Sequence, residues 1–75
     1  MLNDPFVVRQ CEHIAARVSG KAATPREQAD LAFETILLRQ ARADEATKLA
    51  AYIERHGLAN ACQLLVNSSE FLYLD

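Results

Sequence analysis

The sequence predicts a small all-α domain, a bundle of about four short antiparallel helices followed by a final C-terminal helical turn. Three observations predict it. Apolar residues make up 51% of the 75 residues, and they recur at the three- and four-residue spacing of amphipathic helices. Only two Gly and two Pro occur, too few for a loop-rich or all-β fold. Helix-start signals separate the apolar stripes. We expect one helical domain over residues 1–75, and a chain this short needs a dense core.

The first helix is expected from Pro5 to Ser19. Asp4 is its N-cap, and Pro5 occupies the first helical position, where the missing N–H costs nothing. Gly20 is the expected C-terminal stop. The buried stripe is expected to comprise Val7, Cys11, Ile14, Ala15 and Val18.

The second helix has the strongest start signal in the chain. Thr24 is the expected N-cap, Pro25 takes the first helical position, and Glu27 completes a capping box with Thr24. The inward face is expected to comprise Ala29, Ala32, Phe33, Ile36 and Leu37, with Leu38 on its flank.

The end of this helix has no Gly or Pro to mark it, since neither occurs between Arg39 and Asp44. The apolar stripe nevertheless changes phase there, and an unbroken helix could not fold back to cover itself. We therefore expect a break within residues 40–43, with Ala43 or Asp44 opening the third helix. Its new inward face is expected to comprise Ala46, Leu49, Ala50 and Ile53.

Arg55, His56 and Gly57 are expected to end the third helix, because cations favour a helix C-terminus and Gly favours the cap position. A fourth helix is then expected over about residues 58–66, with Leu58, Ala61, Cys62 and Leu65 inward.

Beyond the fourth helix, Asn67-Ser68-Ser69-Glu70 is the pattern of a second capping box. It would open a final turn that carries Phe71, Leu72 and Leu74. Glu70 is expected to cap the backbone at Asn67. In the alternative interpretation, Glu70 makes a polar contact to a partner, with Phe71 and Tyr73 as aromatic anchors.

Charge and hydropathy exclude two classes of partner. The formal net charge is −2 and no basic stripe occurs, so we expect no nucleic-acid binding. No stretch approaches the roughly 20 apolar residues of a membrane span, so we expect no direct membrane insertion. The N-terminus lacks the pattern of a signal peptide, although Met1 is either a natural start or the start of an excised piece.

The two cysteines, Cys11 and Cys62, both fall on expected inward faces. We expect unpaired core thiols, because free Cys usually behaves as a small buried hydrophobe. The alternative is a disulfide between the first and fourth helices, which would contribute roughly 3–4 kcal/mol in an oxidising compartment.

No residues form a recognisable catalytic, metal or cofactor site. His13 follows Cys11 and Glu12, but neighbours on a helix do not converge on one metal, and His56 is expected to interact with the helix dipole. Ser68 and Ser69 adjoin Glu70 and have no base beside them. Five carboxylates at helical spacing are expected on a solvated face: Glu27, Glu34, Asp44, Glu45 and Glu54.

The two ends of the chain also carry a family resemblance. Asn3-Asp4-Pro5-Phe6-Val7 and Leu65-Val66-Asn67-Ser68-Ser69-Glu70-Phe71-Leu72-Tyr73 resemble the last part of a domain of unknown function found in planctomycete proteins. That domain lies at the C-terminal end, commonly after a cytochrome-c-like region and another uncharacterised domain. The resemblance implies that this chain is the C-terminal piece of a larger, exported protein, periplasmic or extracellular. Export would favour the disulfide alternative.

The chain departs from that family at the junction between the second and third helices. The family typically has Arg-Pro-Pro, then Thr or Ser and an acidic residue. Here the stretch reads Arg39-Gln40-Ala41-Arg42-Ala43-Asp44-Glu45, without the prolines or the capping hydroxyl. The resemblance carries no catalytic residues, and any haem would belong to a region that this chain lacks.

Three functions follow as hypotheses. The first is a noncatalytic helical module without a cofactor, which packs against the rest of its parent or binds another protein. The second is a segment that completes an enzyme or haem electron-transfer protein whose active site lies elsewhere. The third is a free-standing helical regulatory protein that begins at Met1.

Overall fold

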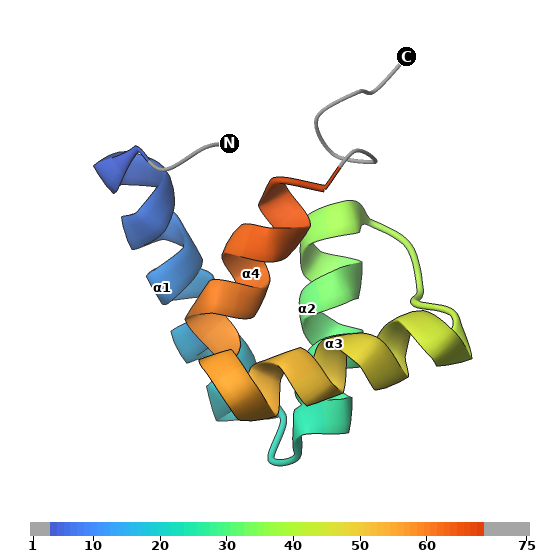
Figure 1. Cartoon of the computed structure of the whole chain (residues 1–75). Helices are drawn as coiled ribbons and strands as arrows, with labels where there is room; N and C mark the ends of the chain where they lie inside the picture. The colour runs from blue at the N-terminus through green and yellow to red at the C-terminus, as the bar shows by residue number, and fades with distance from the viewer. Residues whose placement is uncertain (1–3, 69–75) are drawn as a thin grey trace.

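A computed structural model describes residues 4–68, and all regular secondary structure in this range is helical. The four helices are α1 (Pro5–Lys21), α2 (Pro25–Leu37), α3 (Ala43–His56) and α4 (Leu58–Val66). α1 packs against α4, α2 packs against α3, and α4 contacts all three other helices. α4 therefore lies at the centre of the arrangement in Figure 1. The structure confirms the small all-α bundle.

Side-chain caps begin the first two helices. The Asp4 carboxylate accepts a hydrogen bond from the Phe6 N–H at 2.8 Å. At α2, the Thr24 hydroxyl accepts from the Glu27 N–H at 3.2 Å, and the Glu27 carboxylate accepts from the Thr24 N–H at 3.3 Å. These bonds satisfy N–H groups that have no partner within the helix.

The expected stop at Gly20 is wrong, because α1 continues through Gly20 to Lys21. The Ala22 N–H closes the last turn on the Val18 carbonyl at 2.9 Å. Val18 is 2% exposed and Ala22 is 7% exposed, so the extra turn buries apolar surface. A glycine inside a helix costs only about 1 kcal/mol, and packing outweighs that cost here.

α2 ends at Leu37, and Leu38 does not flank the helix as the sequence predicts. Leu38 adopts a left-handed conformation with φ 61°, which ends the helix. Its side chain is 85% exposed. Residues 38–42 connect to α3, which begins at Ala43 rather than Asp44.

Gly57 joins the last two helices with φ 88°. Its N–H donates to the Ile53 carbonyl at 2.8 Å, and its carbonyl accepts from the Ala61 N–H at 3.2 Å. A positive φ favours glycine, so the end of α3 and the start of α4 share one residue.

α4 ends at Val66, and the side-chain amide of its C-cap residue Asn67 donates to the Gln63 carbonyl at 2.9 Å. Asn67 therefore interacts with the helix before it. The predicted capping box and final turn involve Glu70, Phe71, Leu72 and Leu74, which lie outside the described residues.

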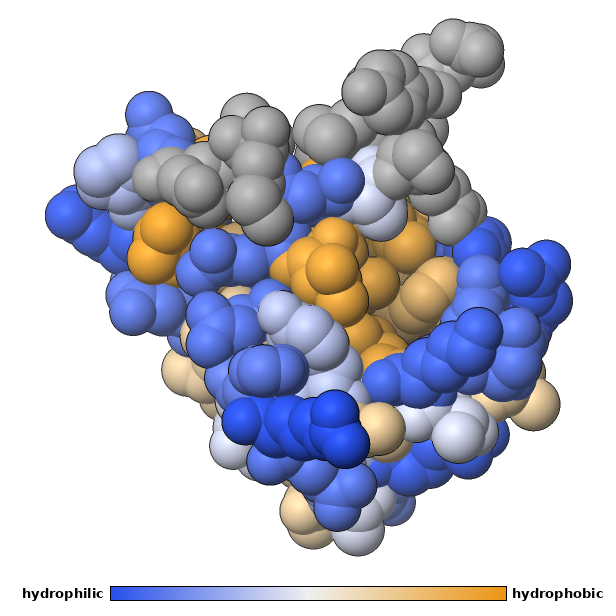
Figure 2. Space-filling view, in the orientation of Figure 1, coloured by the Kyte–Doolittle hydropathy of each residue, from blue (hydrophilic) through white to orange (hydrophobic). Residues whose placement is uncertain are grey.

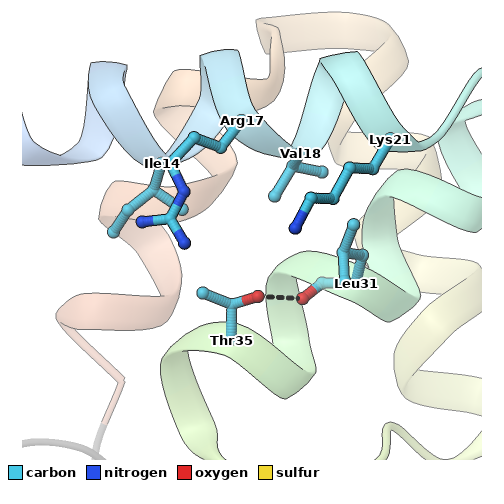
Figure 3. A pocket seen from close by; sticks show the side chains of 6 residues that line it. All are labelled: Ile14, Arg17, Val18, Lys21, Leu31 and Thr35. Atoms are coloured by element: carbon cyan, nitrogen blue, oxygen red, sulfur yellow. Dashed lines mark hydrogen bonds between the residues drawn. The ribbon is translucent and has the colours of Figure 1, made fainter.

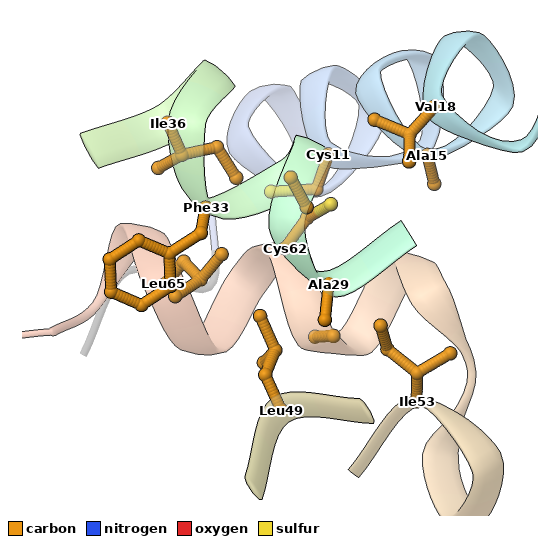
Figure 4. Packing of buried hydrophobic residues seen from close by; sticks show 12 residues of the cluster. Cys11, Ala15, Val18, Ala29, Phe33, Ile36, Leu49, Ile53, Cys62 and Leu65 are labelled. Carbon is orange, nitrogen blue, oxygen red and sulfur yellow. The ribbon is translucent and has the colours of Figure 1, made fainter. Parts of the chain in front are cut away.

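The core is built from all four helices and is rich in small residues (Figure 4). Ala29, Ala32 and Ala61 are fully buried, so the helices approach closely at these points. The side chains of the core cluster are Cys11, Ala15, Val18, Ala29, Ala32, Phe33, Ile36, Leu49, Ile53, Ala61, Cys62 and Leu65.

Candidate functional site

The candidate site is an apolar groove that opens between α4 and the α2–α3 pair. Figure 2 shows it as a hydrophobic hollow bordered by hydrophilic residues. Its volume is about 320 Å³. The apolar residues of its lining are Phe33, Leu49, Tyr52, Leu64 and Leu65.

Helical spacing brings these side chains to one place. Leu49 and Tyr52 are three residues apart on α3 and so share a face. Leu64 and Leu65 are neighbours on α4, and they differ in burial. Leu65 is 5% exposed and belongs to the core, whereas Leu64 is 42% exposed. The groove therefore has a buried floor and a large apolar side chain, Leu64, open to solvent.

A cluster of three charged residues, Arg39, Arg42 and Glu45, lies beside Phe33 at the groove. The Arg39 guanidinium lies 4.7 Å from the centre of the Phe33 ring. It also donates to both carboxylate oxygens of Glu45, at 3.0 and 2.9 Å. The same carboxylate accepts from the Arg42 N–H at 2.8 Å, which caps the first turn of α3. One carboxylate thus joins the α2–α3 connection to α3.

These bonds change the acidity of Glu45. The hydrogen bonds from Arg39 and from the Arg42 backbone, with the two positive charges, lower the pKa of Glu45 from 4.5 to about 2. Hydrogen bonds to the charged form favour that form. The prediction that Glu45 belongs to a solvated face is wrong, because its side chain is only 20% exposed and is ion-paired.

Lys48 gives the groove its other charge. It lines the groove beside Glu45, and within residues 4–68 no hydrogen bond or ion pair holds its ammonium group. Because Glu45 is already neutralised by Arg39 and Arg42, the uncompensated charge at the groove is positive. The arrangement suits a ligand with an apolar body and a nearby carboxylate.

Two other hollows are less suited to a ligand. One, of about 420 Å³, is polar and includes Arg26, Asp30 and Glu34 in its lining, but Arg26 already donates to Thr47 at 3.3 Å. The other lies between α1 and α2, where Arg17 and Lys21 extend over Thr35 (Figure 3). Its volume is about 30 Å³, enough for roughly one or two water molecules.

The two cysteines meet in the core. Cys11 is 1% exposed and Cys62 is fully buried, and their side chains point toward one another from α1 and α4 (Figure 4). Both thiols are free. Burial raises the pKa of Cys11, and burial together with the neighbouring Cys11 raises the pKa of Cys62 to about 12. Thiols of this kind react slowly because the thiolate is the nucleophile.

The histidines and the tail residues complete the placement of the predicted sites. His13 is exposed on α1, and the exposed His56 ring packs 4.6 Å from the Tyr52 ring. Over residues 4–68, no three His, Cys, Asp or Glu side chains group closely enough to hold a metal ion. Phe71 and Tyr73, the predicted anchors, lie outside the described residues.

The charged cluster of Arg39, Arg42 and Glu45 and the groove were not predicted from the sequence. Arg42 and Glu45 have the spacing of the acidic half of a capping box, which was a usable signal. Arg39 and Glu45 lie six residues apart, so no helical rule pairs them. Leu64 also carried a signal, because it is a large apolar residue away from the inward positions Ala61, Cys62 and Leu65.

No helix in the described part of the chain is long and apolar enough to cross a membrane. Comparison with known proteins found no family model, no curated protein and no solved structure that matches this chain.

Proposed function

We propose that this chain is a noncatalytic helical interaction module that binds a protein segment in the groove between α2, α3 and α4. The partner is the rest of a larger parent protein or a separate protein. One observation carries the proposal: the groove is apolar and open, and it presents Leu64 with 42% of its surface exposed. Resemblance to the planctomycete domain and export of the parent remain predictions.

The shape and chemistry of the groove indicate the kind of segment. Apolar side chains left open to solvent gain stability when a partner covers them, by about 25 cal/mol for each Å² of apolar surface buried. An amphipathic helix that lays its apolar face in a groove is a common solution. Lys48 has no bound carboxylate within residues 4–68, so an acidic residue beside the apolar anchors would add electrostatic complementarity.

Selection of peptide ligands tests this proposal. A displayed library of random peptides is selected against the 75-residue chain, and the selected peptides are then tested on two variants. Leu64→Asp places a carboxylate in the groove. Leu38→Asp is the matched control, because Leu38 is also an exposed leucine but does not line the groove.

We expect selected peptides that combine apolar residues at helical spacing with an acidic residue. They should lose at least about tenfold in affinity on Leu64→Asp, which corresponds to about 1.4 kcal/mol, and keep their affinity on Leu38→Asp. Far-UV circular dichroism checks that both variants are folded. Peptides that bind all three proteins equally well would show that the groove is not the binding surface.

A further inference from the structure

The geometry points to an occupant for this groove, and the inference rests on the proposed function. We infer that the C-terminal segment of the same chain, residues 69–75, binds in the groove and competes there with the partner. The module would then regulate its own availability.

The chemistry of the segment matches that of the groove. Its sequence is Ser-Glu-Phe-Leu-Tyr-Leu-Asp, so a run of four apolar or aromatic residues lies between two carboxylates. The groove offers an apolar lining and the ammonium group of Lys48, which pairs with no carboxylate within residues 4–68. Glu45, the other charged residue of the lining, is neutralised by Arg39 and Arg42 and therefore does not repel an acidic segment strongly.

The connection between the segment and the groove is short. The Ser68 N–H donates to the Leu65 carbonyl at 3.1 Å, and Leu65 lines the groove. The segment therefore starts about one helical turn from its proposed site. Seven residues extend up to about 23 Å, and a short tether gives an effective concentration in the millimolar range.

The size of the groove limits what the segment inserts. A volume of about 320 Å³ lies at the lower end of the range for ligand pockets, and so suits one or two large side chains. Phe71 and Tyr73 are the aromatic residues of the segment. Aromatic side chains supply large contact areas at interfaces, so we assign the anchor role to these two.

The test is a double substitution in the full 75-residue chain, Phe71→Ser with Tyr73→Ser. Amide resonances of Leu49, Tyr52 and Leu64, and methyl resonances of the two leucines, are compared with those of the unchanged chain. Leu2→Ser, at the opposite end of the chain, is the control. We expect the double substitution to shift the groove resonances and Leu2→Ser to leave them in place.

The second measurement is the affinity of the selected groove peptides. If the segment occupies about nine tenths of the grooves, its loss raises the apparent affinity about tenfold. Unchanged groove resonances with normal peptide binding would overturn this inference and leave the proposed function standing. Shifted resonances with no peptide ligand would support the segment and count against an external partner. A further outcome is that dilution of the unchanged chain moves its groove resonances to the positions seen in the double variant. That result would assign the occupant to a second copy of the chain and overturn the intramolecular inference.

Discussion

Two neighbouring leucines of α4 should respond very differently to the same substitution. Leu65 is 5% exposed and packs in the core cluster, whereas Leu64 is 42% exposed at the groove. We compare Leu65→Ala with Leu64→Ala, because the helix, the chemical change and the effect on helix propensity are the same. Only the depth of burial differs.

The expected costs follow from that burial. Truncating a buried leucine to alanine costs about 2–5 kcal/mol, because a cavity is added to the lost apolar burial. Leu64→Ala leaves no cavity that water cannot fill, and a half-buried leucine loses about 1 kcal/mol. A chain of this length is stable by roughly 4–11 kcal/mol, so Leu65→Ala removes a large part of the stability and Leu64→Ala a small one.

Thermal and urea unfolding, followed by far-UV circular dichroism, measure both costs. Each kcal/mol corresponds to roughly 4–8 °C in Tm for a domain of this size. We therefore expect Tm to fall by roughly 4–8 °C for Leu64→Ala and by at least twice that for Leu65→Ala. If the costs of Leu65→Ala and Leu64→Ala agreed within about 0.5 kcal/mol, the assignment of Leu65 to the buried floor and of Leu64 to the open side of the groove would be refuted.

Three further predictions concern the connection and the core. Leu38→Gly should raise Tm, because a left-handed conformation costs an L-residue about 1–2 kcal/mol and Leu38 has φ 61°; a lower Tm would mean that its exposed side chain stabilises the fold. The pKa of Glu45 is lowered from 4.5 to about 2 in the folded chain, so its stabilisation is complete above about pH 4.5 and is lost as the pH falls toward 2. Glu45→Gln should flatten the dependence of Tm on pH in that window. An unchanged dependence would contradict the ion pair between Arg39 and Glu45. Iodoacetamide at pH 8 should label Cys11 and Cys62 slowly in the native chain and rapidly in urea, because burial raises the pKa of both thiols; mass spectrometry measures the rates, and rapid native labelling would contradict the buried pair.

The helix starts were predictable because their signals are local. Asp4 needs only the N–H two residues later, and Thr24 and Glu27 need only each other. Gly57 likewise marks the boundary between α3 and α4 by its own φ. Such interactions span at most one helical turn, so the sequence displays them directly.

Gly20 and Leu38 show where local signals fail. Gly20 has the residue type of a helix stop, but the burial of Ala22 carries α1 past it. Leu38 has the residue type of a helix interior, yet it takes the left-handed position that ends α2. At Gly20 the burial of Ala22 outweighs a local preference of about 1 kcal/mol. At Leu38 the end of α2 requires a backbone conformation that costs an L-residue about 1–2 kcal/mol.

By itself, the sequence determined the four helices, most of their boundaries and the apolar residues of the core, because hydrogen bonding and periodicity within a helix are local properties. Only the tertiary structure decided that Arg39 joins Phe33 to Glu45 and that α4 leaves a groove beside α2 and α3. A groove depends on how helices diverge in space, and periodicity along one helix carries no information about that divergence. In the sequence Leu64 is one more apolar residue outside the inward positions, whereas in the fold it lines the groove.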